Sequence, residues 1–389
     1  MVDFSVPANA ETLGREAREF AARHLNDDLV RRDRAGGVEA LDWRPGWAKA
    51  AEFGLLGLTV PEAWGGAGHD VATAVHILQE VGYGCADGGL LLGMGAQIWP
   101  FQMPLLEFAS DELKDRYLPG LVRGQIIAAH AVTELASGSD AMALATTAKA
   151  VDGGFVLNGE KAYIGMAPEC DLAMVFATHD QKLGAWGVSA FLVEAKSKGF
   201  HRGAPEQKMG TRTMPMGSLR FEDCFVPESA IVGRKGAGAA IFNRSLEWER
   251  RFILSGAVGA MRRQLESCAE YATSRQVFGG PIAGHQSVGN RLADMRMRYE
   301  TARLMLQKAA WDADRGMRDP AAAALVKLHI SEAYLASGID AMRNFGGRGY
   351  LEETGIERPV RDALGAVTYG GTSDILRQII AAKAGDVAG

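Results

Sequence analysis

A single acidic side chain interrupts an apolar helical stripe in the C-terminal half of the chain. Residues at steps of three or four share one face of a helix. The six residues on this face are Phe242, Leu246, Glu249, Ile253, Gly256 and Ala260. A carboxylate on an apolar face is costly unless it is paired or functional, and desolvation raises its pKa toward the range useful for a general base near neutral pH. We therefore predict that Glu249 is a general base.

Two neighbouring features bear on this prediction. Glu249 could instead form a structural ion pair with Arg250. We favour catalysis, because buried acids with shifted pKa values gather at functional sites. Glu247 has Arg244 three residues before it and Arg251 four residues after it, which predicts an ordinary solvated charge cluster at the surface.

Three other segments have residue types suited to holding a planar or anionic cofactor. AVTELASGSD (131–140) leaves an expected strand and continues as a loop of small hydroxyl residues, which suits contacts to a planar polar ring. The second segment joins two expected helices through a Gly-Gly-Pro turn, with Arg275, Phe278 and Gln286 around it. The third (344–381) contains glycine-rich turns and a Gly-Gly-Thr-Ser helix start, whose free N–H groups and positive dipole end suit a phosphate or a flavin edge.

Common catalytic signatures are missing from the sequence. It contains no GxGxxG, P-loop, HExxH or GxSxG pattern, and its eight histidines show no metal-ligand spacing. We therefore predict no metal site, and expect any enzymatic chemistry to come from a bound cofactor.

These segments lie in three successive blocks of different periodicity. Apolar residues recur at helical spacing up to about residue 125, short alternating or β-branched runs follow, and the helical pattern then returns to the end of the chain. The absence of βαβ alternation argues against a parallel sheet. The longest C-terminal helical segments are expected near 236–274, 285–316 and 320–344, with a shorter one from Ser373. The predicted domains are an N-terminal helical domain (1–125), a middle β domain (126–232) and a C-terminal helical domain (233–389).

Composition narrows the class of protein. With 389 residues, 47% hydrophobic and 23% charged, the chain is expected to be soluble and globular. The net charge of −5 is spread without a basic block, which makes nucleic acid an unexpected partner. The four cysteines are far apart, the N-terminus does not resemble a signal peptide, and no apolar run approaches the ~20 residues of a membrane span. These features predict a cytoplasmic protein without a membrane segment.

In order and spacing, the three cofactor segments resemble the acyl-CoA dehydrogenase family, and the similarity extends over essentially the full length, including VPEAWGGAG near the N-terminus. The resemblance implies an α+β multidomain fold with an N-terminal helical domain, a middle β-barrel domain and a C-terminal four-helix bundle. It also implies FAD between the middle and C-terminal domains, completed by a neighbouring subunit of a homodimer or homotetramer.

The resemblance assigns roles to individual residues. It places Val132, Thr133 and Ser139 against the isoalloxazine and the substrate thioester. Arg275, Phe278 and Gln286 match residues that hold FAD from the adjacent subunit. The cofactor contacts matched in the last third of the chain are Gly346, Gly347, Thr372 and Asp374.

The usual catalytic glutamate of the family is absent. Its position, directly before the Gly-Thr of the last motif, is Gly370. A minority of the family, including enzymes for branched acyl groups, has the glutamate on the first long C-terminal helix, where Glu249 lies. The resemblance then implies that Glu249 removes the α-proton of an acyl thioester, while the β-hydride passes to flavin N5 and the N–H of Gly370 stabilises the enolate oxygen. Glu249, Gly370 and Arg250 are the candidate catalytic residues.

Partners follow from the same resemblance. An acyl-CoA or an acyl-carrier protein is the expected substrate, and an electron-transfer flavoprotein or another acceptor is expected to reoxidise the flavin. Gly93 and Gly95 suggest room for a modest acyl chain, although helix packing explains them equally well.

Several departures from the family pattern leave alternatives open. KAYIGM (161–166) replaces the usual Lys-x-Trp-Ile-Thr-Asn, so Tyr163 can still stack on the flavin while Gly165 offers no hydroxyl to N5. Arg343 replaces a usual glutamine among the cofactor contacts. A flavin monooxygenase or oxidase, or a non-catalytic flavoprotein scaffold, would fit these changes. A DNA-associated member is disfavoured by the acidic charge balance.

Overall fold

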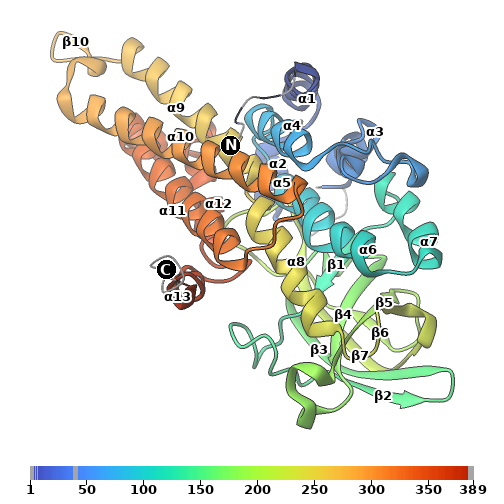
Figure 1. Cartoon of the computed structure of the whole chain (residues 1–389). Helices are drawn as coiled ribbons and strands as arrows, with labels where there is room; N and C mark the ends of the chain where they lie inside the picture. Colours follow the sequence, from blue (N-terminus) through green and yellow to red (C-terminus); the bar gives the residue numbers. More distant parts are fainter. Residues whose placement is uncertain (1–3, 5, 7, 38–42, 384–389) are drawn as a thin grey trace.

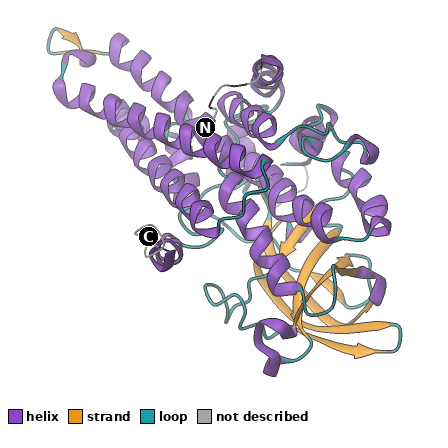
Figure 2. Ribbon diagram, in the orientation of Figure 1, coloured by secondary structure: helices purple, strands orange, loops and turns teal. Residues whose placement is uncertain are grey.

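The computed structural model describes residues 4, 6, 8–37 and 43–383, and divides them into helices, a β-rich middle part and helices again. Figure 1 shows the β part at one end of the molecule and the long C-terminal helices reaching away from it. Figure 2 shows that most strands gather in one region with helices along their border, while a short hairpin lies at the far tip of the long helices. The predicted order of helical, β and helical domains is confirmed.

Side-chain caps define the N-terminal helices of the first part. Asp70, Asp87 and Ser110 accept backbone N–H groups at the starts of α4, α5 and α7, which satisfies donors that a helix start leaves unpaired. A single π-helical turn over Ile98–Gln102 joins α5 to α6. The helices are α1 (Ala8–His24), α2 (Leu29–Ala35), α3 (Arg44–Glu52), α4 (Val71–Gly84), α5 (Gly88–Gln97), α6 (Met103–Phe108) and α7 (Asp111–Val122).

The middle part is one mixed sheet in the order β6-β7-β3-β2-β4-β5-β8, with β1 beside β4. Most pairs are antiparallel, but β1 runs parallel to β4, with Ala128 opposite Leu172, so the sheet is not purely antiparallel. The β-like runs of the sequence are IIAAHAV, GFVLNG, DLAMVFAT, WGVSAFLVEA and GSLRFEDCFV. They do not include β2, which buries only Ala148, the three-residue β6 or the two-residue β8. The strands are β1 (Ala128–Ala131), β2 (Thr147–Val151), β3 (Gly154–Gly165), β4 (Leu172–Thr178), β5 (Val188–Glu194), β6 (Phe200–Arg202), β7 (Met216–Pro227) and β8 (Ile231–Val232).

The C-terminal part contains long helices and one small hairpin. The segment expected as one helix near 236–274 is two helices, because the chain turns at Ile253 and Leu254. Strands β9 (Gln276–Val277) and β10 (Gly280–Pro281) form the hairpin between α9 and α10. The helices are α8 (Gly238–Phe252), α9 (Ser255–Ser274), α10 (Gln286–Asp314), α11 (Pro320–Phe345), α12 (Glu357–Ala366) and α13 (Ser373–Lys383).

One large core joins the two helical parts and holds α8 and α9 in place. Trp99 packs against Trp248 and Phe252, with ring centroids 6.1 and 4.7 Å away. Helices α4 and α9 approach at two glycines: a Cβ on Gly82 would lie 2.0 Å from the carbonyl oxygen of Gly256, and a Cβ on Gly259 would lie 1.9 Å from that of Gln79. The close approach therefore requires glycine at both positions.

The described residues form neither a membrane-spanning helix nor a cluster of metal ligands. None of their helices has the length and apolar character needed to cross a membrane. None of their acidic, histidine and cysteine side chains cluster as a metal site would require.

Candidate active site

Glu249 and Gly370 meet in space although they come from different elements. Glu249 lies in the last turn of α8, and Gly370 lies in the turn between α12 and α13. A Cβ built on Gly370 would point at Glu249 and lie 3.2 Å from its Oε1. A side chain at either position therefore enters the same small volume, so a carboxylate from α8 can occupy the space that a residue at 370 would otherwise fill.

Two cations hold the turn on which Gly370 lies. Arg250 Nε donates to the carbonyl oxygen of Gly370 at 2.9 Å, and Lys327 Nζ donates to that of Gly371 at 2.8 Å. Both glycines have positive φ, +65° and +99°, which side-chain-bearing residues rarely adopt. Because both carbonyl groups are bound, the orientation of the turn beside Glu249 is restrained.

The Glu249 carboxylate has no hydrogen bond or ion pair within the described part of the chain. Arg250, the expected partner in the structural alternative, binds the Gly370 carbonyl instead. Glu249 keeps some contact with solvent, yet it is densely surrounded by protein, and this burial raises its pKa while Arg250 and Lys327 oppose the rise. Burial also lowers the pKa of Lys327 to about 8. A free carboxylate with a raised pKa has the properties of a general base.

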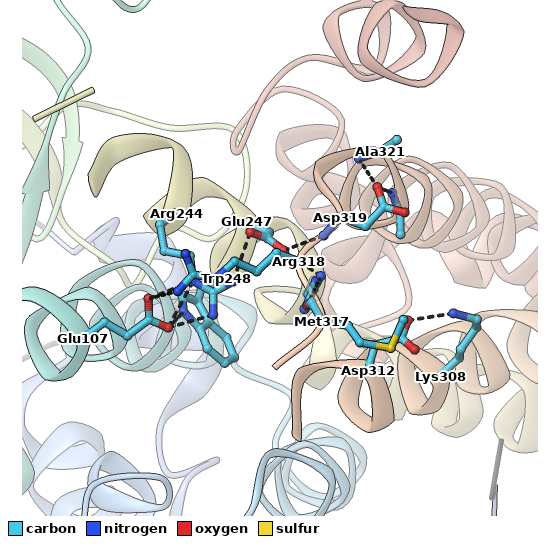
Figure 3. Close-up of polar contacts among 12 residues, drawn as sticks. Glu107, Arg244, Glu247, Trp248, Lys308, Asp312, Met317, Arg318, Asp319 and Ala321 are labelled. Atoms are coloured by element: carbon cyan, nitrogen blue, oxygen red, sulfur yellow. Dashed lines mark hydrogen bonds and ion pairs between the residues drawn. The ribbon is translucent and has the colours of Figure 1, made fainter. Parts of the chain in front are cut away.

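Glu247 is not on the surface, so that prediction is wrong. It is 5% exposed and pairs with Arg244 at 3.0 Å and Arg251 at 2.6 Å. Figure 3 shows why the spacing of the charges predicted a surface position wrongly. Glu107 of α6 binds the same Arg244, and the backbone N–H of Asp319 donates to Glu247 at 3.0 Å. Elements distant in sequence cover a charge pattern that would be solvated on an isolated helix. The cluster anchors α8 to α6 and to the start of α11.

A buried ion pair anchors the hydroxyl-rich loop after β1. Lys161 Nζ lies 2.8 Å from Glu134 Oε1 and 2.9 Å from the carbonyl oxygen of Val132. Glu134 also accepts the N–H groups of Ala145 and Thr146 at the far end of the loop. Thr133 is partly exposed beside this anchor, and Ser139 is fully exposed on the loop. The pair thus fixes the base of the loop and leaves its outer part accessible.

Tyr163, on β3 next to this loop, is an exposed aromatic residue. Its side chain is 58% exposed and its φ is +58°, an unusual conformation for a bulky residue. Gly165 follows it on the same strand. An accessible ring in a strained backbone conformation beside an open loop fits a surface that a planar cofactor covers.

The second group of predicted cofactor residues lies far from this loop in the same chain. Arg275, Phe278 and Gln286 surround the hairpin at the tip of α9 and α10, which Figure 1 shows at the opposite end of the molecule from the sheet. Phe278 is 98% exposed with φ +49°. Arg275 and Gln286 are also exposed. A large apolar side chain presented in this way suits contact with another subunit.

The remaining predicted cofactor residues lie at the ends of α11 and the start of α13. Arg343 is exposed and pairs with Asp340 at 3.3 Å. Gly346 and Gly347 are exposed after α11, Thr372 is half-buried and its hydroxyl accepts the N–H of Ile375, and Asp374 is exposed in the first turn of α13. Gly93 and Gly95 face packed side chains rather than open space: Met166 lies 3.5 Å from a Cβ at 93, and Ile253 lies 3.1 Å from a Cβ at 95.

Comparison with known proteins decides the family. Residues 7–125 match the acyl-CoA dehydrogenase N-terminal domain, residues 129–224 the middle domain and residues 236–385 the C-terminal domain. The chain belongs to the acyl-CoA dehydrogenase family. The expected resemblance is confirmed, and as a member of this family the protein is an FAD-dependent oxidoreductase that dehydrogenates an acyl thioester.

Three relatives within the family are especially informative. An L-prolyl-[peptidyl-carrier protein] dehydrogenase of Pseudomonas fluorescens is 42% identical over 336 residues, covering 86% of this chain and 88% of that protein. The crystal structure of the prolyl acyl carrier protein oxidase AnaB has a TM-score of 0.95 and 40% identity, covering 97% of this chain and 99% of the other. The structure of PigA with FAD and proline has a TM-score of 0.94 and 36% identity, covering 99% of each chain.

Sequence reasoning missed several residues of the site. Lys327 was not considered, although a lysine among Ala323, Ala324, Val326 and Ile330 on α11 interrupts a buried stripe much as Glu249 does. The Lys161–Glu134 pair joins two segments that had been considered separately. No local pattern could have revealed that contact.

Proposed function

We propose that this acyl-CoA dehydrogenase family member oxidises a prolyl group held as a thioester on a carrier protein. The relatives with 42% and 40% identity are named for prolyl groups on carrier proteins, and they match 86% and 97% of the chain. The observation that carries the proposal is the unpaired Glu249 carboxylate facing Gly370. Gly370 occupies the position of the usual catalytic glutamate and has no side chain, so Glu249 supplies the base there.

Glu249 acts in this proposal as the general base that removes the α-proton of the bound thioester. Its carboxylate is free of hydrogen bonds in the described chain, so no protein contact must break before proton transfer. Because its pKa is raised, Glu249 is a stronger base than an exposed glutamate and is better suited to remove a proton from a weakly acidic carbon. Bound FAD supplies the acceptor for the hydride.

Gly370 contributes through its backbone. The N–H of this residue is the proposed donor to the thioester oxygen, on which negative charge develops as the α-proton leaves. Arg250 and Lys327 bind the carbonyl groups of Gly370 and Gly371, so they are positioning residues that preorganise the turn rather than groups that touch the substrate.

The proposed cofactor site combines residues that are far apart in one chain. Val132, Thr133, Ser139 and Tyr163 would contact the flavin from the middle part. Arg275, Phe278 and Gln286 would complete the site of a neighbouring copy, which makes a homodimer or homotetramer the working assembly. The contacts proposed from the last third of the chain are Arg343, Gly346, Gly347, Thr372 and Asp374. We place the protein in the cytoplasm, where its four buried, unpaired cysteines would stay reduced.

Dioxygen is a second candidate for the electron acceptor, beside an electron-transfer flavoprotein. One relative is named an oxidase, and Gly165 offers no side-chain hydroxyl near Tyr163. Reoxidation of the reduced holoenzyme in air decides between them. Reoxidation within the turnover time supports dioxygen, and reoxidation that is slow compared with turnover supports a protein acceptor.

The substrate proposal is tested by anaerobic titration of the purified flavoprotein. L-prolyl-carrier protein is compared with butyryl-CoA, and the loss of flavin absorbance is followed. We expect bleaching with the prolyl thioester. Bleaching by the acyl-CoA alone would refute the prolyl assignment while retaining thioester dehydrogenation.

A further inference from the structure

A small cavity opens close to the proposed base. Its lining includes Tyr369, the residue before Gly370, and Ile253, whose N–H donates to the Glu249 carbonyl. The charge of Glu249 also acts on the Tyr369 hydroxyl. The cavity therefore adjoins the turn whose Gly370 faces the Glu249 carboxylate.

The cavity has an apolar wall and a polar end. Leu91 and Leu92 of α5 face Ile253 and Leu254, which suits the carbon atoms of a small ring. The polar lining residues, called the polar end below, are Asp362 of α12, Tyr334 of α11 and Arg263 of α9, together with Thr211. A pocket for a simple hydrocarbon chain would not need polar groups there, because burying such groups without partners is costly.

Asp362 has one carboxylate oxygen without a partner. The residue is 4% exposed, and its Oδ1 accepts the N–H of Thr211 at 2.5 Å. Within the described chain no group donates to Oδ2, which lies only 2.3 Å from where a Cβ on Gly88 would stand. Because residue 88 is a glycine, no side chain at this position displaces the Asp362 Oδ2 atom from the cavity wall. Burial raises the pKa of Asp362 to about 7, and the nearby charges of Asp33 and Asp87 add to this rise, while the Thr211 N–H and the charge of Arg361 oppose it.

The cations around Asp362 are bound to other groups. Arg361, its neighbour in sequence, pairs with Asp33 at 2.6 Å and with Glu357 at 3.0 Å. Lys208 donates to the carbonyl oxygens of Thr211 and Met214. These interactions leave Asp362 without a direct ion-pair partner among the described residues.

Arg263 also lines the cavity, and its guanidinium group is bound to backbone carbonyl groups. Its Nη1 donates to the carbonyl oxygens of Gly82, Tyr83 and Cys85 at 2.6, 2.6 and 2.9 Å, at the C-terminal end of α4. A helix C-terminus favours a cation, so the guanidinium is held there by the backbone. Asp362 thus remains the accessible acceptor.

Two tyrosine hydroxyl groups at the same cavity have no hydrogen-bond partner in the described part of the molecule. Tyr334 is 5% exposed and Tyr369 is half-buried, and burial raises the pKa of both. Both hydroxyl groups stay protonated and can donate or accept. These two hydroxyl groups and Asp362 Oδ2 are three polar groups at one small cavity that have no hydrogen-bond partner among the described residues.

We infer that this polar end of the cavity binds the nitrogen of an aminoacyl group, with Asp362 accepting its N–H and Tyr334 and Tyr369 completing the contacts. The inference rests on the proposed function and deepens it, because it assigns recognition of the amino group to named residues. A secondary amine in a five-membered ring offers an N–H to the carboxylate and carbon atoms to the leucine wall. An acyl group without nitrogen would leave Asp362 unsatisfied.

The test compares two thioesters of the same shape on the FAD-loaded enzyme. L-prolyl-pantetheine has a ring N–H where cyclopentanecarbonyl-pantetheine has a methylene group. The rate of anaerobic flavin reduction is measured with each thioester. The decisive quantity is the change in the prolyl-to-cyclopentanecarbonyl rate ratio on substitution, since the intrinsic reactivity of each substrate cancels. Asp362→Asn is expected to lower this ratio by about 10- to 100-fold, as for loss of a hydrogen bond to a charged group.

Matched variants separate recognition from structural damage. Tyr334→Phe removes a hydroxyl without changing charge and should lower the ratio by a smaller factor. Asp312→Asn alters a buried acid that pairs with Lys308 and does not line the cavity, and it should leave the ratio at the wild-type value. If the Asp362→Asn variant loses its flavin, the inference is tested by the prolyl-to-cyclopentanecarbonyl rate ratio of Tyr334→Phe alone.

Two results would overturn the inference. Equal slowing of both substrates by Asp362→Asn, or an unchanged ratio in Tyr334→Phe when it decides alone, would show that these residues do not recognise nitrogen. If the wild-type enzyme reduced its flavin with neither thioester, nor with the carrier-protein substrate, the proposed function itself would fail.

Discussion

Replacing Glu249 with glutamine is the most direct test of the chemistry. The amide keeps the size of the side chain but cannot accept a proton, so the α-proton of the substrate loses its base. Loss of a general base slows reactions by about 10²- to 10⁴-fold, which corresponds to about 3–5 kcal/mol of activation free energy. We expect stopped-flow flavin reduction to slow by this factor while FAD content is unchanged.

The structure also predicts the effect of this substitution on stability. No donor in the described chain binds the Glu249 carboxylate, so glutamine leaves no hydrogen bond unmade. Burial raises the pKa of Glu249 in the folded state, so its stability contribution is fully present below the unfolded pKa and is lost as the pH rises through the folded pKa. At pH 8 the variant should therefore unfold at the same or a higher temperature than the wild type, and the difference should vanish in acid.

The matched control is Glu247→Gln, two residues away on the same helix. This side chain lies in the ion cluster of Figure 3 and makes no contact with Gly370. The control should unfold at a lower temperature yet reduce its flavin at nearly the wild-type rate. Flavin reduction in Glu249→Gln as fast as in the wild type would refute the assignment of the base.

Four further results are expected. The rate of flavin reduction should rise with pH through the raised pKa of Glu249, because only the carboxylate accepts a proton, and a pH-rate profile checks this. Glu247→Ala should lower stability by about 3–5 kcal/mol in chemical denaturation, since two buried arginines lose their shared partner. Gly370→Ala should slow flavin reduction and lower the unfolding temperature, because its Cβ would stand 3.2 Å from the base at a φ of +65°. Lys161→Met should lower the FAD content of the purified protein, because it leaves the buried Glu134 carboxylate without its cation.

Local sequence patterns predicted a large part of this protein for identifiable reasons. The change from helical to alternating periodicity marked the three domains, since each period reflects the face that an element buries. Strands β2 and β6 were not predicted, because β2 is mostly exposed and β6 is only three residues long. The turn between α8 and α9 was not predicted, because the helical spacing of apolar residues continues across it.

The two glutamates of α8 show where such reasoning ends. Spacing separated Glu249, on an apolar face, from Glu247, flanked by arginines. The surface position predicted for Glu247 was wrong, because Glu107 and the backbone of Asp319 reach the cluster from other elements. Helical periodicity describes one helix and contains no information about the neighbours that cover it.

The sequence by itself determined which groups are available: an acid on an apolar stripe, a glycine at position 370, and cofactor segments in the family order. Only the tertiary structure decided that the Cβ direction of Gly370 points at Glu249, that Lys327 and Arg250 bind the adjoining carbonyl groups, and that Asp362 opens onto the neighbouring cavity. These contacts join residues far apart along the chain, and their distances depend on how α8, α11 and α12 pack together.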